Sequence, residues 1–209
     1  MSKKSGGNYK LKSVWIDAGL EAPEEYGDSY MYINGSASKG GYASPSGYKE
    51  FDDDEYAYYT VYIDGVRTSK VLLTTTDKYA SIFKGDDVFG GFYKFNVDDD
   101  GVYEIAPVAE KYIERNVKLT KGMVVREGTK YYLYADETDG VELKVEVLDI
   151  SGGTTTETKT DAAVNSLERL AELLGEGYTI TVNYMFSLSE DKLNEIPTGV
   201  MYVTAVKAP

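Results

Sequence analysis

The chain has 209 residues, of which 42% are hydrophobic and 27% charged, a balance typical of a folded protein with a buried core. It carries 22 Lys and Arg against 35 Asp and Glu, so its formal net charge is −13. Such a surface repels phosphate backbones, which argues against nucleic acid as a partner. Neither Cys nor His is present, so disulfides, thiol nucleophiles, the usual zinc sites and the commonest general base are excluded.

Twenty tyrosines against six phenylalanines favour β-sheet, because tyrosine packs its ring on a half-buried strand face and keeps its hydroxyl in water. No apolar run approaches the roughly 18 residues of a membrane span, so no membrane insertion is expected. Residues 1–7 are small and polar, and residues 1–10 lack the apolar core of a signal peptide. We predict that residues 1–11 are a disordered lead or a cloning remnant and that, if the protein is exported, this chain is an excised piece of it.

Short β-type runs dominate the first half of the chain. The alternation in residues 59–63, followed by Asp64-Gly65, predicts a strand that ends in a hairpin turn, and residues 95–103 repeat the pattern around an Asp-rich turn. The strands expected here are 13–16, 29–33, 56–63, 70–75, 91–97 and 102–105.

The second half of the chain combines strands with a single amphipathic helix. The helix is predicted at about 162–174, with Thr160 or Asp161 as its N-cap and Gly175 as its stop. Its apolar positions share one face, which should pack on a sheet; they are Val164, Leu167, Leu170, Leu173 and Leu174. Strands are expected at 122–126, 130–135, 141–150, 178–188 and 200–206, with an exposed loop at 151–160.

These elements predict a mainly β fold with one α-helix in the C-terminal half. The chain is long enough for two small domains, and we expect two tandem antiparallel β-barrels or sandwiches. The first would span residues 12–110 and the second 111–209, with a junction near residues 108–118.

The second half ends in two sequence segments, Leu-Leu-Gly-Glu-Gly-Tyr-Thr-Ile-Thr-Val at 173–182 and Val-Met-Tyr-Val-Thr-Ala-Val at 200–206. Similar strand-and-turn phrases occur at 62–65, 83–86, 93–97 and 101–105. Together they resemble the repeated β-modules of large surface proteins from Gram-positive anaerobes, proteins that also carry S-layer homology domains. Those anchor domains are absent from this sequence.

This resemblance implies a function that is structural rather than enzymatic. Such a module would space, stiffen or decorate a bacterial cell surface, without catalytic residues or a cofactor. Its expected location is extracellular, at the cell surface. Its expected partners are neighbouring surface-protein modules or cell-surface glycans.

Residues 96–101 match the opening of a calcium loop, in which oxygens at alternate positions wrap the ion. The candidate ligands are Asn96, Asp98 and Asp100. Position twelve of the loop is Pro107, which has no carboxylate, so an acidic hairpin turn is the simpler interpretation and any Ca²⁺ binding should be weak. Further acidic clusters at 52–55 and 86–87 are expected to be solvated loops unless they converge in space.

Two alternative functions stay open at this stage. A carbohydrate-binding adhesin would present a row of aromatic rings, which Trp15, Tyr56, Tyr58, Tyr59 and Tyr62 could supply, although strand packing explains the same tyrosines more simply. A glycosidase needs only two carboxylates about 5 to 10 Å apart, and a chain with 35 acidic residues always allows that. Two Ser-x-x-Lys pairs, at 46–49 and 81–84, lack the companion motifs of serine acyl-transfer enzymes and are interpreted as chance.

Overall fold

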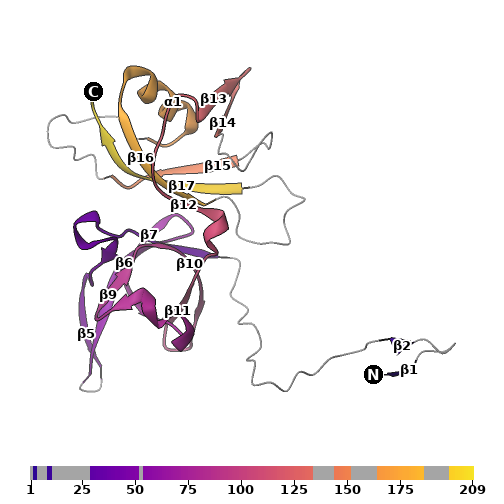
Figure 1. The fold of residues 1–209 in the computed structure, drawn as a ribbon. Coiled ribbons are helices and arrows are strands. Elements are labelled where there is room, and N and C mark those ends of the chain that lie inside the picture. The colour runs from indigo at the N-terminus through magenta and orange to yellow at the C-terminus, as the bar shows by residue number, and fades with distance from the viewer. Residues whose placement is uncertain are drawn as a thin grey trace.

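The computed structural model describes residues 2–3, 9–10, 29–51, 54–133, 144–151, 164–185 and 198–209. Within these residues the chain is mainly β with one α-helix, which confirms the predicted fold class. Two lobes follow one another along the chain (Figure 1). We call residues 30–107 the barrel lobe and residues 113–207 the helix lobe.

Five strands of the barrel lobe close into a barrel. The strands are β3 Tyr30–Ile33, β6 Asp54–Ile63, β7 Val66–Thr74, β10 Gly91–Val97 and β11 Val102–Pro107. β6 pairs with β3 and β7, β10 pairs with β3 and β11, and all these pairs are antiparallel. A parallel pair between β7 and β11 completes the closure. This is the Greek-key order of the five-stranded OB barrel.

The barrel interior is filled by alternate side chains of its strands, as the period of two requires. Tyr59 and Val61 of β6 point inward and are 3% and 0% exposed. The β6–β7 hairpin turns at Asp64 and Gly65, whose φ angles are 46° and 81°. Positive φ at both central residues is the geometry of a type I′ turn, so the hairpin predicted here is confirmed.

Small elements decorate the barrel, and the sequence patterns did not predict them. Strand β5 (Gly47–Phe51) extends the sheet outward from β6, and the two-residue strands β4 (Tyr42–Ala43) and β8 (Phe83–Lys84) flank β9 (Asp87–Phe89) in a separate sheet. The 3-10 helix η1 (Ala37–Lys39) lies between β3 and β4, and η2 (Asp77–Ile82) lies between β7 and β8. Segments this short hold too few residues for a periodic signal.

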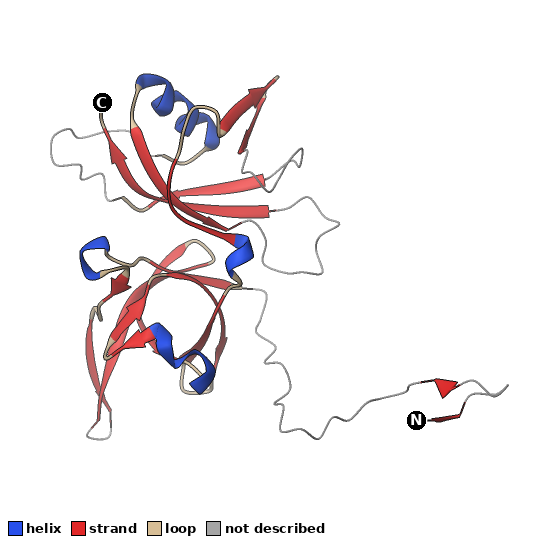
Figure 2. Cartoon of the chain, in the orientation of Figure 1, coloured by secondary structure: helices blue, strands red, loops and turns tan. Residues whose placement is uncertain are grey.

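The helix lobe is built on a four-stranded sheet. A long central strand pairs antiparallel with one neighbour and parallel with the other. The helix and a small hairpin cover one face of the sheet (Figure 2). The sheet order is β12 Ile113–Lys118, β16 Thr179–Met185, β17 Thr198–Lys207 and β15 Lys144–Asp149; the hairpin is β13 Val124–Glu127 with β14 Lys130–Leu133.

The helix α1 runs from Leu167 to Glu176, and its buried face of four leucines is the predicted one. Its boundaries differ from the prediction. Ser166 caps the N-terminus by accepting a 3.2 Å hydrogen bond from the Arg169 amide, because the chain is still extended at this serine. The predicted stop at Gly175 was wrong, since the helix continues to Glu176 and Gly177 ends it with φ 95°. The predicted N-caps at 160 and 161 lie outside the described residues.

The described strand pairs join each lobe internally and do not cross between them. Each lobe also contains one parallel pair beside its antiparallel ones. The predicted boundary near residue 110 falls at η3 (Glu110–Tyr112), between the two sheets, and stays a prediction. In the segment predicted as a disordered lead, β1 (Ser2–Lys3) pairs with β2 (Tyr9–Lys10). Within the described residues, no helix is long and apolar enough to cross a membrane.

The two glycines near the end of α1 should respond in opposite ways to the same substitution. Gly175 is helical and exposed, with nothing within 4 Å of an added Cβ, so Gly175→Ala should stabilise the protein by about 0.5–1 kcal/mol. Gly177 has a left-handed backbone, so Gly177→Ala should destabilise it by about 1–2 kcal/mol. Urea unfolding of both variants measures this difference. Equal effects would contradict the helix end described here.

Candidate functional site

A cluster of aromatic side chains fills the seam between the two lobes. Tyr32 from the barrel lobe stacks on Tyr202 of β17, with ring centroids 4.0 Å apart and planes 10° from parallel. The hydroxyls of Tyr30 and Tyr202 lie 3.2 Å apart in a buried hydrogen bond. We call this the seam cluster; its buried members are Tyr30, Tyr32, Phe92, Val108, Ile113, Met185, Val200 and Tyr202.

Burial in the seam changes the chemistry of these phenols. Removal from water disfavours the phenolate and raises the pKa of Tyr30 and of Tyr32 to about 12. The same cause raises the pKa of Tyr202 further, and the hydrogen bond with Tyr30 adds to it. These hydroxyls are therefore neutral hydrogen-bonding groups at physiological pH.

A cavity of about 580 Å³ opens in the seam beside this cluster. Its volume lies within the range of small-molecule sites. The barrel lobe contributes the loop after β3 and the start of β10, and the helix lobe contributes strands β12, β16 and β17. The lining residues are Tyr32, Asn34, Gly35, Ala37, Gly40, Gly41, Phe89, Gly90, Gly91, Phe92, Arg115, Asn116, Thr181, Asn183, Thr204 and Ala205.

Glycines form the barrel-lobe wall because two backbone segments meet there without side chains between them. A Cβ on Gly35 would lie 1.9 Å from the Gly41 carbonyl oxygen, and one on Gly90 would lie 2.5 Å from the Gly35 nitrogen. The Gly90 amide donates a 2.8 Å hydrogen bond to the Gly41 carbonyl. Larger residues at 35 or 90 would force these segments apart and reshape the wall.

Asn183 joins the two lobes at the edge of the cavity. Its side-chain amide donates a 2.7 Å hydrogen bond to the Tyr32 hydroxyl, and its Oδ1 accepts a 2.6 Å bond from the Asn116 backbone amide. Asn116 has φ 55° and lies where the pairing of β12 with β16 is interrupted by a bulge. The bulge presents Arg115 and Asn116 to the cavity, a common role of bulges at sheet edges.

Arg115 is the one charged side chain among the described residues that line the cavity. Its Nη1 forms an ion pair with Glu110, while its Nε is buried without a hydrogen-bond partner among the described residues. A Cβ on Gly91 would lie 3.2 Å from Nη2 and 3.6 Å from Nε, so the guanidinium packs into the space that a side chain at this position would occupy. The cavity thus combines a cation, side-chain amides and aromatic rings, a set suited to binding.

The predicted calcium ligands lie elsewhere, in the β10–β11 hairpin. The Oδ1 atom of Asp98 accepts hydrogen bonds from the backbone amides of Asp100, at 3.0 Å, and Val102, at 2.8 Å. This carboxylate therefore holds the turn. Asn96 lies within β10, where it pairs with Glu104 of β11. Among the described residues, no three acidic side chains gather in the way a metal site requires.

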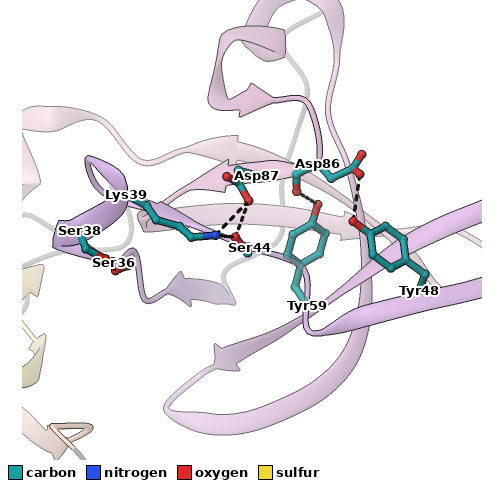
Figure 3. A network of polar contacts seen from close by, with 8 residues as sticks. All are labelled: Ser36, Ser38, Lys39, Ser44, Tyr48, Tyr59, Asp86 and Asp87. Atoms are coloured by element: carbon teal, nitrogen blue, oxygen red, sulfur yellow. Dashed lines mark hydrogen bonds and ion pairs between the residues drawn. The ribbon is translucent and has the colours of Figure 1, made fainter.

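Asp86 and Asp87 belong to a surface network on the barrel lobe (Figure 3). Tyr48 donates to the Asp86 carboxylate at 3.1 Å, and Ser44 donates to the Asp87 carboxylate at 2.5 Å. Lys39 donates to Ser44 and lies 4.0 Å from Asp87. The Ser44 hydroxyl accepts from Lys39 and donates to Asp87, so these contacts tie the loop around Ser44 to β9. Residues 52 and 53 of the other acidic cluster lie outside the described residues.

The tyrosines considered for a glycan-binding row do not share a face. Tyr59 points into the barrel and donates a 2.6 Å hydrogen bond to the Asp86 carbonyl. Tyr62 packs against the seam cluster, whereas Tyr56 is 46% exposed. Trp15 lies outside the described residues. Sequence reasoning missed the seam cavity, since residues from five separate segments meet there.

The raised tyrosine pKa values predict a stability loss at high pH. The unfolded chain ionises its tyrosines near pH 10, whereas folding holds Tyr30, Tyr32 and Tyr59 neutral to about 12. Stability should therefore be complete below pH 10 and fall as the pH rises towards 12. Chemical unfolding between pH 7 and 12 tests this, with absorbance at 295 nm to follow phenolate formation. Buried tyrosines that ionise before unfolding would contradict it.

The acidic turns predict a weak response to calcium. With a Kd of about 0.1–1 mM, Ca²⁺ at several times that concentration should stabilise the fold by about 1 kcal/mol per site. The measurement is a thermal melt in EDTA, in sodium chloride of matched ionic strength and in calcium. Asp98→Asn is the matched variant, because it keeps the oxygen that holds the turn and removes the charge. Unfolding in EDTA would reveal a structural metal site, and identical melts in calcium and salt would reject binding.

Comparisons with known proteins identify no relative from which a function could be inferred. No family model, no curated protein and no solved structure matches the chain. The resemblance to surface-protein modules therefore depends on the strand-and-turn phrases quoted above. Since one fold serves many functions, the barrel order by itself assigns none.

Proposed function

We propose that the chain is a non-enzymatic structural module of a bacterial cell-surface protein, one that holds neighbouring modules at a fixed spacing and orientation. The seam cluster is the observation that carries this proposal. A spacer transmits orientation only if its own parts do not rotate, and the stacked pair of Tyr32 and Tyr202 resists rotation between the lobes. The expected setting is extracellular, with neighbouring modules or surface glycans as partners.

The strand pairing also suits a mechanical function. β17 runs through the centre of the helix-lobe sheet, bonded to β16 on one side and β15 on the other. Successive residues alternate between two cores, with Met201 and Val203 facing α1 and Val200 and Tyr202 facing the barrel lobe. This strand cannot move without opening both cores.

Of the alternatives, glycan binding gains support from the seam cavity. A glycosidase would need two carboxylates flanking a sugar. None of the described residues that line the seam cavity is Asp or Glu. A screen with chromogenic glycosides checks the non-enzymatic proposal directly, and hydrolysis of any of them by purified protein would reject it.

The spacer function requires that the two lobes keep a fixed orientation, and this rigidity can be measured. Because the chain has no cysteine, Val97→Cys and Glu168→Cys can each carry a spin label at an exposed position, one in each lobe. Distances measured by double electron–electron resonance should form one narrow distribution. Tyr202→Ala removes the stacked ring at a cost of about 3–5 kcal/mol and should broaden it.

Val61→Ala is the control for that variant, because it weakens the barrel core and leaves the seam intact. It should lower stability and keep the distance distribution narrow. A broad distribution in the parent protein would reject the rigid-spacer function. To test the cellular setting, the full-length gene should encode an export signal and wall-anchor repeats.

A further inference from the structure

We propose that the seam cavity binds a sugar acid, the carboxylated unit of an acidic glycan, with its carboxylate held by Arg115. This inference goes beyond the spacer function, which would stand without it. It depends on the charge, the unpaired donor and the composition of the walls.

The charge of the cavity has the opposite sign to that of the protein. The whole chain carries −13, yet Arg115 gives the described cavity lining its single charge, and that charge is positive. A guanidinium matches a carboxylate through two parallel N–H···O bonds. Because Glu110 already pairs with this guanidinium, a singly charged carboxylate is repelled less than a doubly charged phosphate.

The guanidinium has donor capacity left over. The guanidinium carries five N–H groups. Its Nη1 forms an ion pair with Glu110, and its buried Nε has no hydrogen-bond partner among the described residues. A buried donor without a partner is costly. Nε is buried against the start of β10, where a Cβ on Gly91 would lie 3.6 Å from it, so a carboxylate in the cavity would accept from the N–H groups of Nη1 and Nη2 that Glu110 does not use.

The remaining walls suit the rest of a sugar ring. Asn34, Asn116 and Thr181 place amide and hydroxyl groups around the cavity, which can exchange hydrogen bonds with sugar hydroxyls. Phe89 offers an aromatic surface, held against Gly41 at the barrel-lobe wall. A few polar groups on an aromatic wall are the usual composition of a small-molecule site.

Glu110 tunes the site from outside. It pairs with Arg115 and is 73% exposed, and it is not among the cavity-lining residues. It therefore competes with an incoming carboxylate for the guanidinium. Glu110→Gln should tighten binding a few-fold, because it removes this competition and one negative charge.

The test is isothermal titration calorimetry of the full chain with three sugar acids, D-glucuronic, D-galacturonic and N-acetylneuraminic acid. D-Glucose, D-galactose, acetate and inorganic phosphate serve as comparison probes. At least one sugar acid should bind at least tenfold more tightly than the neutral sugars and acetate. Arg115→Gln should weaken that binding about tenfold or more, the loss expected for a charge-assisted hydrogen bond. Arg126→Gln removes an equal charge from β13, outside the cavity lining, and should leave the affinity unchanged.

Ala37→Glu is a second variant that avoids disturbing the core. Ala37 is an exposed cavity-lining residue of η1, so the new carboxylate should repel the ligand while the fold stays intact. Three results would overturn the inference: no binding of any sugar acid, acetate or phosphate binding as tightly as the sugar acid, or Arg115→Gln binding as tightly as the parent. If the spin-label distances stay narrow while no sugar acid binds, the cavity inference fails and the spacer function survives.

Discussion

The stacking of Tyr32 on Tyr202 is the contact on which the arrangement of the two lobes depends. The described sheets of the two lobes share no strand pairs, so their relative position is fixed by side chains rather than by a hydrogen-bond ladder. Stacked rings contribute beyond the area they bury because their quadrupoles favour a defined geometry. The Tyr30–Tyr202 hydrogen bond constrains the position of the same two lobes. Breaking it would leave a buried hydroxyl without a partner, which is costly. The seam is therefore a specific joint.

The seam cavity exists because this joint is incomplete. Glycines keep the barrel-lobe wall free of side chains, and the β12 bulge places Arg115 and Asn116 at the cavity. Asn183 bridges the lobes at its edge. A guanidinium with an unpaired donor would be a poor choice for simple filling, because an apolar side chain would seal the seam at lower cost.

The sequence predicted those features that arise from local periodicity. The strands around residues 59–63 and 91–97 and the leucine face of α1 each carry a repeating pattern, and the Asp64-Gly65 turn carries its own backbone requirement. The helix ends were misplaced because Gly175 and Gly177 look alike in sequence, and only the backbone angle distinguishes a tolerated glycine from a required one. The parallel pairs were missed because pairing direction depends on how the chain returns across the sheet.

The candidate site was beyond sequence reasoning for a related reason. Arg115 has no motif around it, and Gly91, which lies against its guanidinium, belongs to a strand that periodicity explains fully. The spacing of the acidic turn at Asp98 resembles that of a calcium loop, yet its carboxylate accepts hydrogen bonds from backbone amides. A short motif indicates only the local spacing of its oxygens, and the same carboxylate oxygen can accept hydrogen bonds in a turn or bind an ion.

A structural role and a binding role would reinforce one another at this seam. A ligand bound between two lobes stabilises the arrangement in which both contact it, in proportion to its occupancy. For a surface module, this would couple spacing to the glycans around it, because contacts from Arg115 and from the loop after β3 would close the remaining gap between the lobes. The coupling needs no large motion, since the stacked tyrosines already hold the lobes in place. The seam would then combine a permanent aromatic contact with a second, ligand-dependent one on the same two surfaces.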